Sequence, residues 1–269
     1  MDVASGRVRT VVEKGTIKSI SVVPERIVYA LEHLRSPAEL YSVRPDGSDV
    51  TTLTRINAEK VAAARMGKPE QFTFKGARGD VVFCTVVKPV NFDPAKKCPV
   101  AFLIHGGPQG SFGNDFHYRW NPQTYAGAGY ATVAVDFHGS TGYGQAFHDT
   151  IRRDWGGKPL EDLKKGLEAA LQRCPRMDGT PWSNPQEYEK QNPVNFVKNW
   201  KAPTLVVHGG RDYRIPYVNG ISTFTALQRL GGPSRFLCFP DENHWVLKPR
   251  NSILWHETVI GWLDQWTKK

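Results

Sequence analysis

Long hydrophobic runs are absent from this sequence. The longest uninterrupted apolar stretch, residues 100–104, is far below the roughly 20 residues that a membrane helix needs. The first ten residues have no apolar core, so the sequence as given carries no secretory signal or membrane anchor. These absences predict a protein without a membrane partner, which we expect in the cytoplasm by default.

Cysteine and clustered charge are also scarce. The 4 cysteines have no C-x-x-C spacing, which predicts reduced, partly buried thiols and not a disulfide framework or a zinc site. Lysine and arginine outnumber the acidic residues by 35 to 26, yet they occur as pairs at most and are interleaved with acids. Such scattered charge is typical of a solvated surface. Because no zinc-finger spacing or basic helix accompanies it, we expect no nucleic-acid partner.

The front of the chain has the pattern of a small antiparallel sheet. Alternating stretches are joined by turns such as Pro45-Asp46-Gly47-Ser48. The stretches cover residues 17–22, 27–31, 39–43 and 50–54. Four short strands amount to one blade of a β-propeller, which needs about 4 to 8 blades to close. We therefore assign residues 1–65 to a propeller-blade remnant and its linker.

From residue 66 onward, strands alternate with helices. A hairpin predicted over residues 70–87 precedes the buried strands. Those strands are expected at residues 100–104, 132–137, 204–207 and 236–239, and helical spacing at residues 160–171, 221–230 and 259–266. This alternation predicts an α/β fold with a mostly parallel sheet covered on both faces. In such sheets the chemistry lies in loops at the carboxyl ends of strands.

Three of these loops carry residues suited to hydrolysis. Gly106 and Gly107 follow the first buried strand, where backbone N–H groups can form part of an oxyanion hole, although a plain glycine-rich strand exit has the same pattern. Asp212 and His244 follow the last two strands, in the order of the acid and base of α/β-hydrolases. An Asp212–His244 surface hydrogen bond without function is the alternative.

Five segments carry a family resemblance. They are HGGPQGSFG, VDFHGSTGYGQAF, DWGGKPLEDL, NPVNFVKNWKAPTLVVHGGRDYRIP and FPDENHWVLKPRN. Together they resemble the catalytic domain of the prolyl-oligopeptidase family of serine peptidases, most of all its dipeptidyl-peptidase V group. The resemblance implies an α/β-hydrolase fold, a peptide substrate and no cofactor. It also implies that Asp212 and His244 are the triad acid and base, that Gly106 and Gly107 belong to the oxyanion hole, and that intact relatives are often secreted.

The family's nucleophile elbow, G-x-S-x-G-G, has no counterpart in this sequence. Neither Ser111 nor Ser140 has glycine two positions before it. The segment ending at Gly179 resembles the lead-in to the elbow strand, whereas the segment from Pro181 resembles one well beyond it. We therefore predict a gap near residue 180, with a central strand, the elbow, its helix and the next strand missing together.

The missing serine predicts a peptidase by descent with little or no turnover. Two alternatives stay open, a non-catalytic peptide- or protein-binding pseudoenzyme and a non-functional truncated gene product. A loop hydroxyl at Thr180 or Ser183 lacks a positioned base, and Cys174 lacks an activating partner, so none of them is expected to replace the serine. The sequence has no Rossmann glycine motif and no H-E-x-x-H zinc motif, and no metal is expected.

Overall fold

The computed structural model describes residues 5–96, 98–107, 109–152, 154–173 and 193–268. It divides into two compact units, Met1–Asp178 and Gly179–Lys269, which are described separately. The first unit contains both the predicted blade region and the start of the predicted hydrolase domain. The division into residues 1–65 and 66–269 therefore stays a prediction.

The front of the first unit is the expected four-stranded antiparallel meander. Its strands are β1 (Thr16–Val23), β2 (Arg26–His33), β3 (Ser36–Val43) and β4 (Thr51–Thr52), paired in chain order. Asp46 closes the predicted turn between the last two strands, because its side chain accepts the backbone N–H of Ser48 at 2.8 Å. Gly47 has a φ of +85°, a conformation that favours glycine at this turn.

The second sheet of this unit has the strand order β5-β6-β8-β7. Its elements and the connecting helices are α1 (Ala58–Ala63), β5 (Pro69–Lys75), η1 (Ala77–Gly79), β6 (Val81–Val87), β7 (Val100–Leu103), α2 (Pro122–Gly127), β8 (Ala131–Asp136), α3 (Gln145–Asp149) and α4 (Lys158–Arg173). The predicted hairpin is β5–β6. The prediction of one mostly parallel sheet is wrong for this unit, where only β7 and β8 pair in parallel and β6 runs antiparallel to both β5 and β8.

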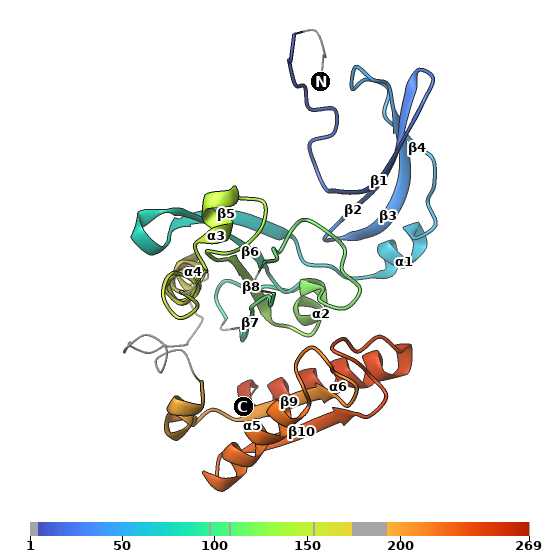
Figure 1. Cartoon of the computed structure of the whole chain (residues 1–269). Coiled ribbons are helices and arrows are strands. Elements are labelled where there is room, and N and C mark those ends of the chain that lie inside the picture. Colours follow the sequence, from blue (N-terminus) through green and yellow to red (C-terminus); the bar gives the residue numbers. More distant parts are fainter. Residues whose placement is uncertain (1–4, 97, 108, 153, 174–192, 269) are drawn as a thin grey trace. The chain divides into compact units, whose positions relative to one another are not determined.

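Strand β8 forms the centre of this sheet, and all six of its residues are buried. Successive side chains of a strand point to opposite faces. On one face Val135 packs beneath α4, where a side chain at Gly166 would clash with it. On the other face Thr132 donates its hydroxyl to the carbonyl of Pro122 in α2, at 3.0 Å. Helices therefore cover both faces, as predicted for an α/β fold (Figure 1).

The second unit is built on two parallel strands. It contains η2 (Pro193–Asn199), β9 (Thr204–Gly209), α5 (Val218–Arg229), β10 (Ser234–Phe239) and α6 (Pro249–Thr267) (Figure 1). Helix α5 packs on both strands, and Phe224 stacks on Phe236 with ring centroids 5.6 Å apart. Residues 204–208 of β9 are only half-buried, in contrast to β8. The short sheet thus leaves an apolar strand incompletely covered.

Candidate active site

Asp212 lies in the turn that follows β9. Its backbone N–H donates to the carbonyl of Gly209 at 3.2 Å, and its side chain is buried. One carboxylate oxygen, Oδ1, accepts the backbone N–H groups of Arg214 and Ile215 at 3.0 and 2.9 Å. The other, Oδ2, lies 2.8 Å from Nδ1 of His244. The turn therefore fixes the carboxylate and aims one oxygen at the imidazole.

The environment of Asp212 favours its charged form. Burial by itself would raise the pKa of this carboxyl, but hydrogen bonds from Ile215, His244 and Arg214 outweigh it and hold the pKa below the usual value. At neutral pH, Asp212 is therefore a carboxylate. A fixed negative charge beside Nδ1 stabilises the imidazolium that forms whenever His244 takes up a proton.

His244 follows β10 and keeps one face toward solvent. Its side chain is 33% exposed, against 6% for Asp212. The carboxylate at Nδ1 selects the tautomer that carries its proton there, which leaves a lone pair on Nε2. In the part of the chain that the structure describes, Nε2 makes no hydrogen bond. An imidazole held in this way can take up a proton at Nε2.

Gly209 allows the two loops to meet. A Cβ atom at this position would lie 2.1 Å from the carbonyl oxygen of Asn243 and 2.6 Å from that of Glu242. Both atoms belong to the backbone of the His244 loop, so a larger residue could not be accommodated without moving that loop. The spacing between the acid and the base therefore depends on the absence of a side chain at the end of β9.

Gly106 and Gly107 lie in the first unit, in the exposed loop after β7. Gly107 has a φ of +136°, which an L side chain rarely adopts. The loop is held by the segment after β8, since His105 Nε2 lies 2.9 Å from Ser140 Oγ and Thr141 N–H donates to the Gly110 carbonyl at 2.9 Å. A role in one site with the Asp212–His244 pair stays a prediction.

The two serines considered as near misses have other surroundings. Ser140 is fully buried on His105, and Ser111 lies in the loop after the glycines. Among the described residues of the second unit, no serine or threonine hydroxyl makes a hydrogen bond to Nε2 of His244. Thr180, Ser183 and Cys174 lie outside the described residues. Of the described cysteines, Cys84 is buried and Cys98 is half-buried, as predicted, whereas Cys238 is exposed.

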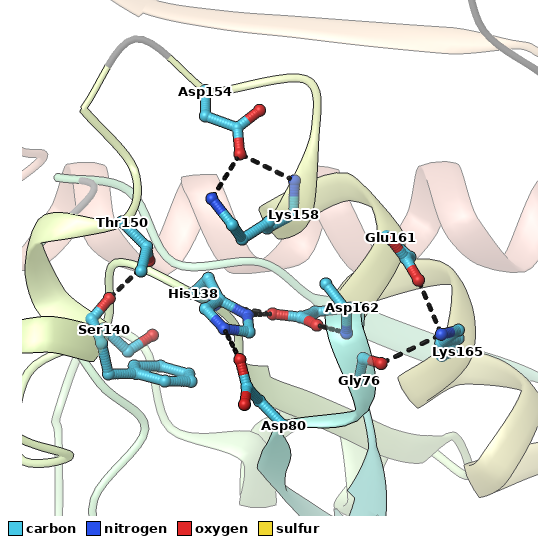
Figure 2. Close-up of polar contacts among 12 residues, drawn as sticks. Gly76, Asp80, His138, Ser140, Thr150, Asp154, Lys158, Glu161, Asp162 and Lys165 are labelled. Carbon is cyan, nitrogen blue, oxygen red and sulfur yellow. Dashed lines mark hydrogen bonds and ion pairs between the residues drawn. The ribbon is translucent and has the colours of Figure 1, made fainter.

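Sequence reasoning missed two buried groups. Glu242, 3% exposed, accepts three hydrogen bonds within the His244 loop and helix α6. In the first unit, His138 lies between the carboxylates of Asp162 and Asp80, as Figure 2 shows. A sequence signal for Glu242 was the adjacent pair Asp241-Glu242 just before His244. Of these two acids, only Glu242 is buried. No sequence signal paired His138 with Asp162, which is 24 positions away.

The described residues provide neither a metal-binding cluster nor a membrane-spanning helix. Within the described ranges, no group of three or more His, Cys, Asp or Glu side chains is arranged to hold a metal ion. None of the helices described is both long enough and apolar enough to cross a membrane.

The first unit has a sheet covered by helices on both faces, and the second has an Asp–His pair in the loops after two parallel strands. Both features are typical of the α/β-hydrolase fold. The Pyrococcus horikoshii acylaminoacyl peptidase has the same fold, with a TM-score of 0.82 and 23% identity over 94% of this chain and 50% of that structure. The prolyl oligopeptidase family matches residues 116–178 and 175–269. This chain belongs to that family.

Curated relatives agree with this assignment. Dipeptidyl-peptidase 5 of Schizosaccharomyces pombe is 38% identical over 257 aligned positions, which include 74% of this chain and 38% of the relative. Dipeptidyl-peptidase 5 of Aspergillus fumigatus is 31% identical over 289 positions, with 85% of this chain and 40% of the relative. The chain therefore spans about two fifths of the length of these relatives.

The alignment lengths also reveal an internal difference. For the S. pombe relative, 74% of 269 residues is about 199 residues, so the 257 aligned positions exceed them by about 58. For the A. fumigatus relative, 85% is about 229 residues, and 289 positions exceed them by about 60. Both relatives thus have nearly the same total number of positions where this chain has gaps. The family matches in two pieces that meet at residues 175–178.

Proposed function

We propose that this chain is the hydrolase domain of a dipeptidyl-peptidase-type serine peptidase that has kept its acid and base but lost covalent catalysis. The observation that carries this proposal is the 2.8 Å contact between Asp212 Oδ2 and His244 Nδ1, with Nε2 free in the described part of the chain. In covalent peptide hydrolysis such an Nε2 takes the proton of a hydroxyl nucleophile and passes it to the leaving amine. The proposed ligand is therefore a peptide.

Loss of turnover is proposed because the hydroxyl partner is missing. The sequence has no G-x-S-x-G motif, the relatives have about 58 to 60 positions that this chain lacks, and the two family matches meet next to Gly179. Without the nucleophile, a triad retains only about 10³- to 10⁴-fold acceleration over water, from the oxyanion hole and binding. The second oxyanion donor follows the nucleophile and is proposed to be lost with it.

The main alternative is a non-catalytic peptide- or protein-binding module. It is favoured by the survival of both the ordered Asp212–His244 pair and the anchored loop around Gly106 and Gly107. A non-functional truncated product is the other alternative, and the half-buried apolar strand β9 favours it. Covalent reactivity would contradict all three possibilities, and cooperative folding distinguishes the truncated product from the other two.

A fluorescent fluorophosphonate probe tests the proposal, because it labels only an activated nucleophile. Purified full-length chain, the His244→Ala variant and heat-denatured chain are compared, each with a circular-dichroism melt. We expect no labelling and a cooperative melt. Labelling that requires His244 and the native fold would overturn the proposal, since an unrecognised hydroxyl would then be active. Neither labelling nor a cooperative melt would favour the truncated product.

A further inference from the structure

Glu242 is a buried carboxylate two residues before the proposed base. Its Oε2 accepts the backbone N–H of Leu247 at 3.0 Å. Its Oε1 accepts the backbone N–H of Lys248 at 2.9 Å and the side-chain amide of Asn251 at 2.8 Å. Burial would raise the pKa of Glu242, but these donors outweigh it and lower the pKa, so the group is charged at neutral pH.

These bonds tie the His244 loop to a long, rigid element. Lys248 is the N-cap residue of α6, which extends over 19 residues, and Asn251 lies in its first turn. A negative charge at a helix N-terminus is stabilised by the helix dipole and by its unpaired N–H groups. The hydrogen bonds from Glu242 to Leu247 and Lys248 close a loop of four residues, Asn243 to Val246, which contains His244.

The backbone of Glu242 holds the loop that carries the acid. Its carbonyl accepts the N–H of Arg211, the residue before Asp212, at 2.9 Å. The same carbonyl lies against Gly209, where no side chain could be accommodated. One residue therefore contacts the acid's loop through its backbone and the base's loop through its side chain.

We infer that Glu242 is a positioning residue that sets the His244 ring against Asp212. It touches neither the ring nor any reacting atom, so it acts through the loop. The inference rests on the proposed role of His244 as the base. The readout is the ring's tautomer, which follows from its contact with Asp212 and does not require a nucleophile or turnover. The fluorophosphonate result therefore cannot decide it.

The test is ring-¹⁵N NMR of the full-length chain labelled at its 8 histidines, with the His244 signals identified by their loss in His244→Gln. In the unmodified chain we expect the Nδ1–H tautomer to predominate at His244. Glu242→Gln keeps the size of the side chain but removes its charge and turns one acceptor into a donor, which then faces the N–H group of Leu247 or of Lys248. We expect the Nδ1–H to Nε2–H ratio to fall about fivefold or more, the lower end of typical coupling between sites.

Asp241→Asn is the matched control, because it removes the neighbouring carboxylate, which is half-exposed and pairs with Lys248 Nζ. It should leave the tautomer unchanged. Asn251→Ala removes one donor to Glu242 and should shift the ratio in the same direction by a smaller factor, which keeps the test decisive if Glu242→Gln does not fold. An unchanged ratio in folded Glu242→Gln, or in Asn251→Ala if that variant alone folds, would overturn the inference. So would equal shifts in Glu242→Gln and Asp241→Asn.

Discussion

The two units each contain a histidine whose Nδ1 faces an aspartate, and the two pairs differ in burial and in the surroundings of the second ring nitrogen. In the first unit, His138 Nδ1 lies 2.5 Å from Asp162 with both side chains fully buried. In the second, His244 Nδ1 lies 2.8 Å from Asp212 with a third of the imidazole exposed. The contact itself is nearly the same. What differs is the other ring nitrogen.

The second nitrogen of His138 is occupied. Its Nε2 lies 3.2 Å from Asp80, while the same Asp162 carboxylate also accepts the backbone N–H groups of His138 and Ala77, both at 2.7 Å (Figure 2). His138 thus has a structural role: its contacts connect the segment after β8 with the η1 turn and with α4. In contrast, His244 has Nε2 free in the described part of its unit. An Asp–His distance alone therefore does not identify a catalytic pair.

The largest expected effect comes from restoring the missing partner of His244. At the predicted junction near residue 180, we insert the segment that the S. pombe relative has there; this chain lacks about 58 positions of that relative in total. If the second unit lacks only its nucleophile, fluorophosphonate labelling should rise from background by at least about 10³-fold, in line with the loss measured when a triad member is removed.

The control for this insertion replaces by alanine the nucleophile serine that the family resemblance implies within it. It should return labelling to background without affecting the circular-dichroism melt. A folded insertion variant that stays unlabelled would show that the Asp212–His244 pair cannot serve as acid and base in this chain.

A smaller effect distinguishes the two aspartates by stability. Asp162→Ala leaves several buried N–H groups without an acceptor, so we expect a loss of about 3–5 kcal/mol of unfolding free energy. Asp212→Ala exposes the N–H groups of Arg214 and Ile215 to nearby water, so its loss should be about 1–2 kcal/mol. Urea melts give these values, and hydrogen exchange assigns each loss to its unit. Equal losses would mean that both pairs are structural.

The smallest effect concerns pH near neutrality. Burial lowers the pKa of His105 below its usual value of about 6.5. The folded state then disfavours the proton, so this stability is complete above about pH 6.5 and is lost as pH falls through the lowered pKa. Burial also lowers the pKa values of His33 and His117 in the same unit. The lowered pKa of Asp212 has no effect in this range.

Melting temperatures between pH 7.5 and pH 5 test this difference. The first unit should lose stability as the pH falls, and His105→Gln, which can still bond Ser140, should reduce that loss without abolishing it. The second unit should change less. Steeper pH dependence in the second unit would reverse the comparison.

Much of this fold follows from local patterns in the sequence. The alternation in residues 17–43, the hairpin of β5 and β6 and the leucine spacing of α4 predicted their elements to within a few residues. The short helices α1, α2 and α3 were missed because each has at most six residues, too few for a helical period to repeat. Asn121 before Pro122 was an available signal for α2, since it caps the N–H of Gln123 at 2.9 Å.

The residues of the site that sequence reasoning found are those whose residue type and position after a predicted strand both match the acid and base of a hydrolase. Asp212 and His244 were identified because each follows a predicted strand, and the structure brings them together. Glu242 and His138 could not be found in this way, because their partners are set by packing between distant segments. Burial of a charged group depends on which neighbours surround it in three dimensions, and no spacing rule records that.

The close approach at Gly209 has a consequence for comparing related chains. The acid and the base can both be retained in a sequence while their meeting is lost, if a larger residue at the end of β9 pushes the loops apart. A glycine at position 209 in a related chain thus indicates that the two loops can still bring the aspartate and the histidine into contact. In a lineage that has given up both catalysis and the pair, this glycine would be free to drift before either charged residue changes.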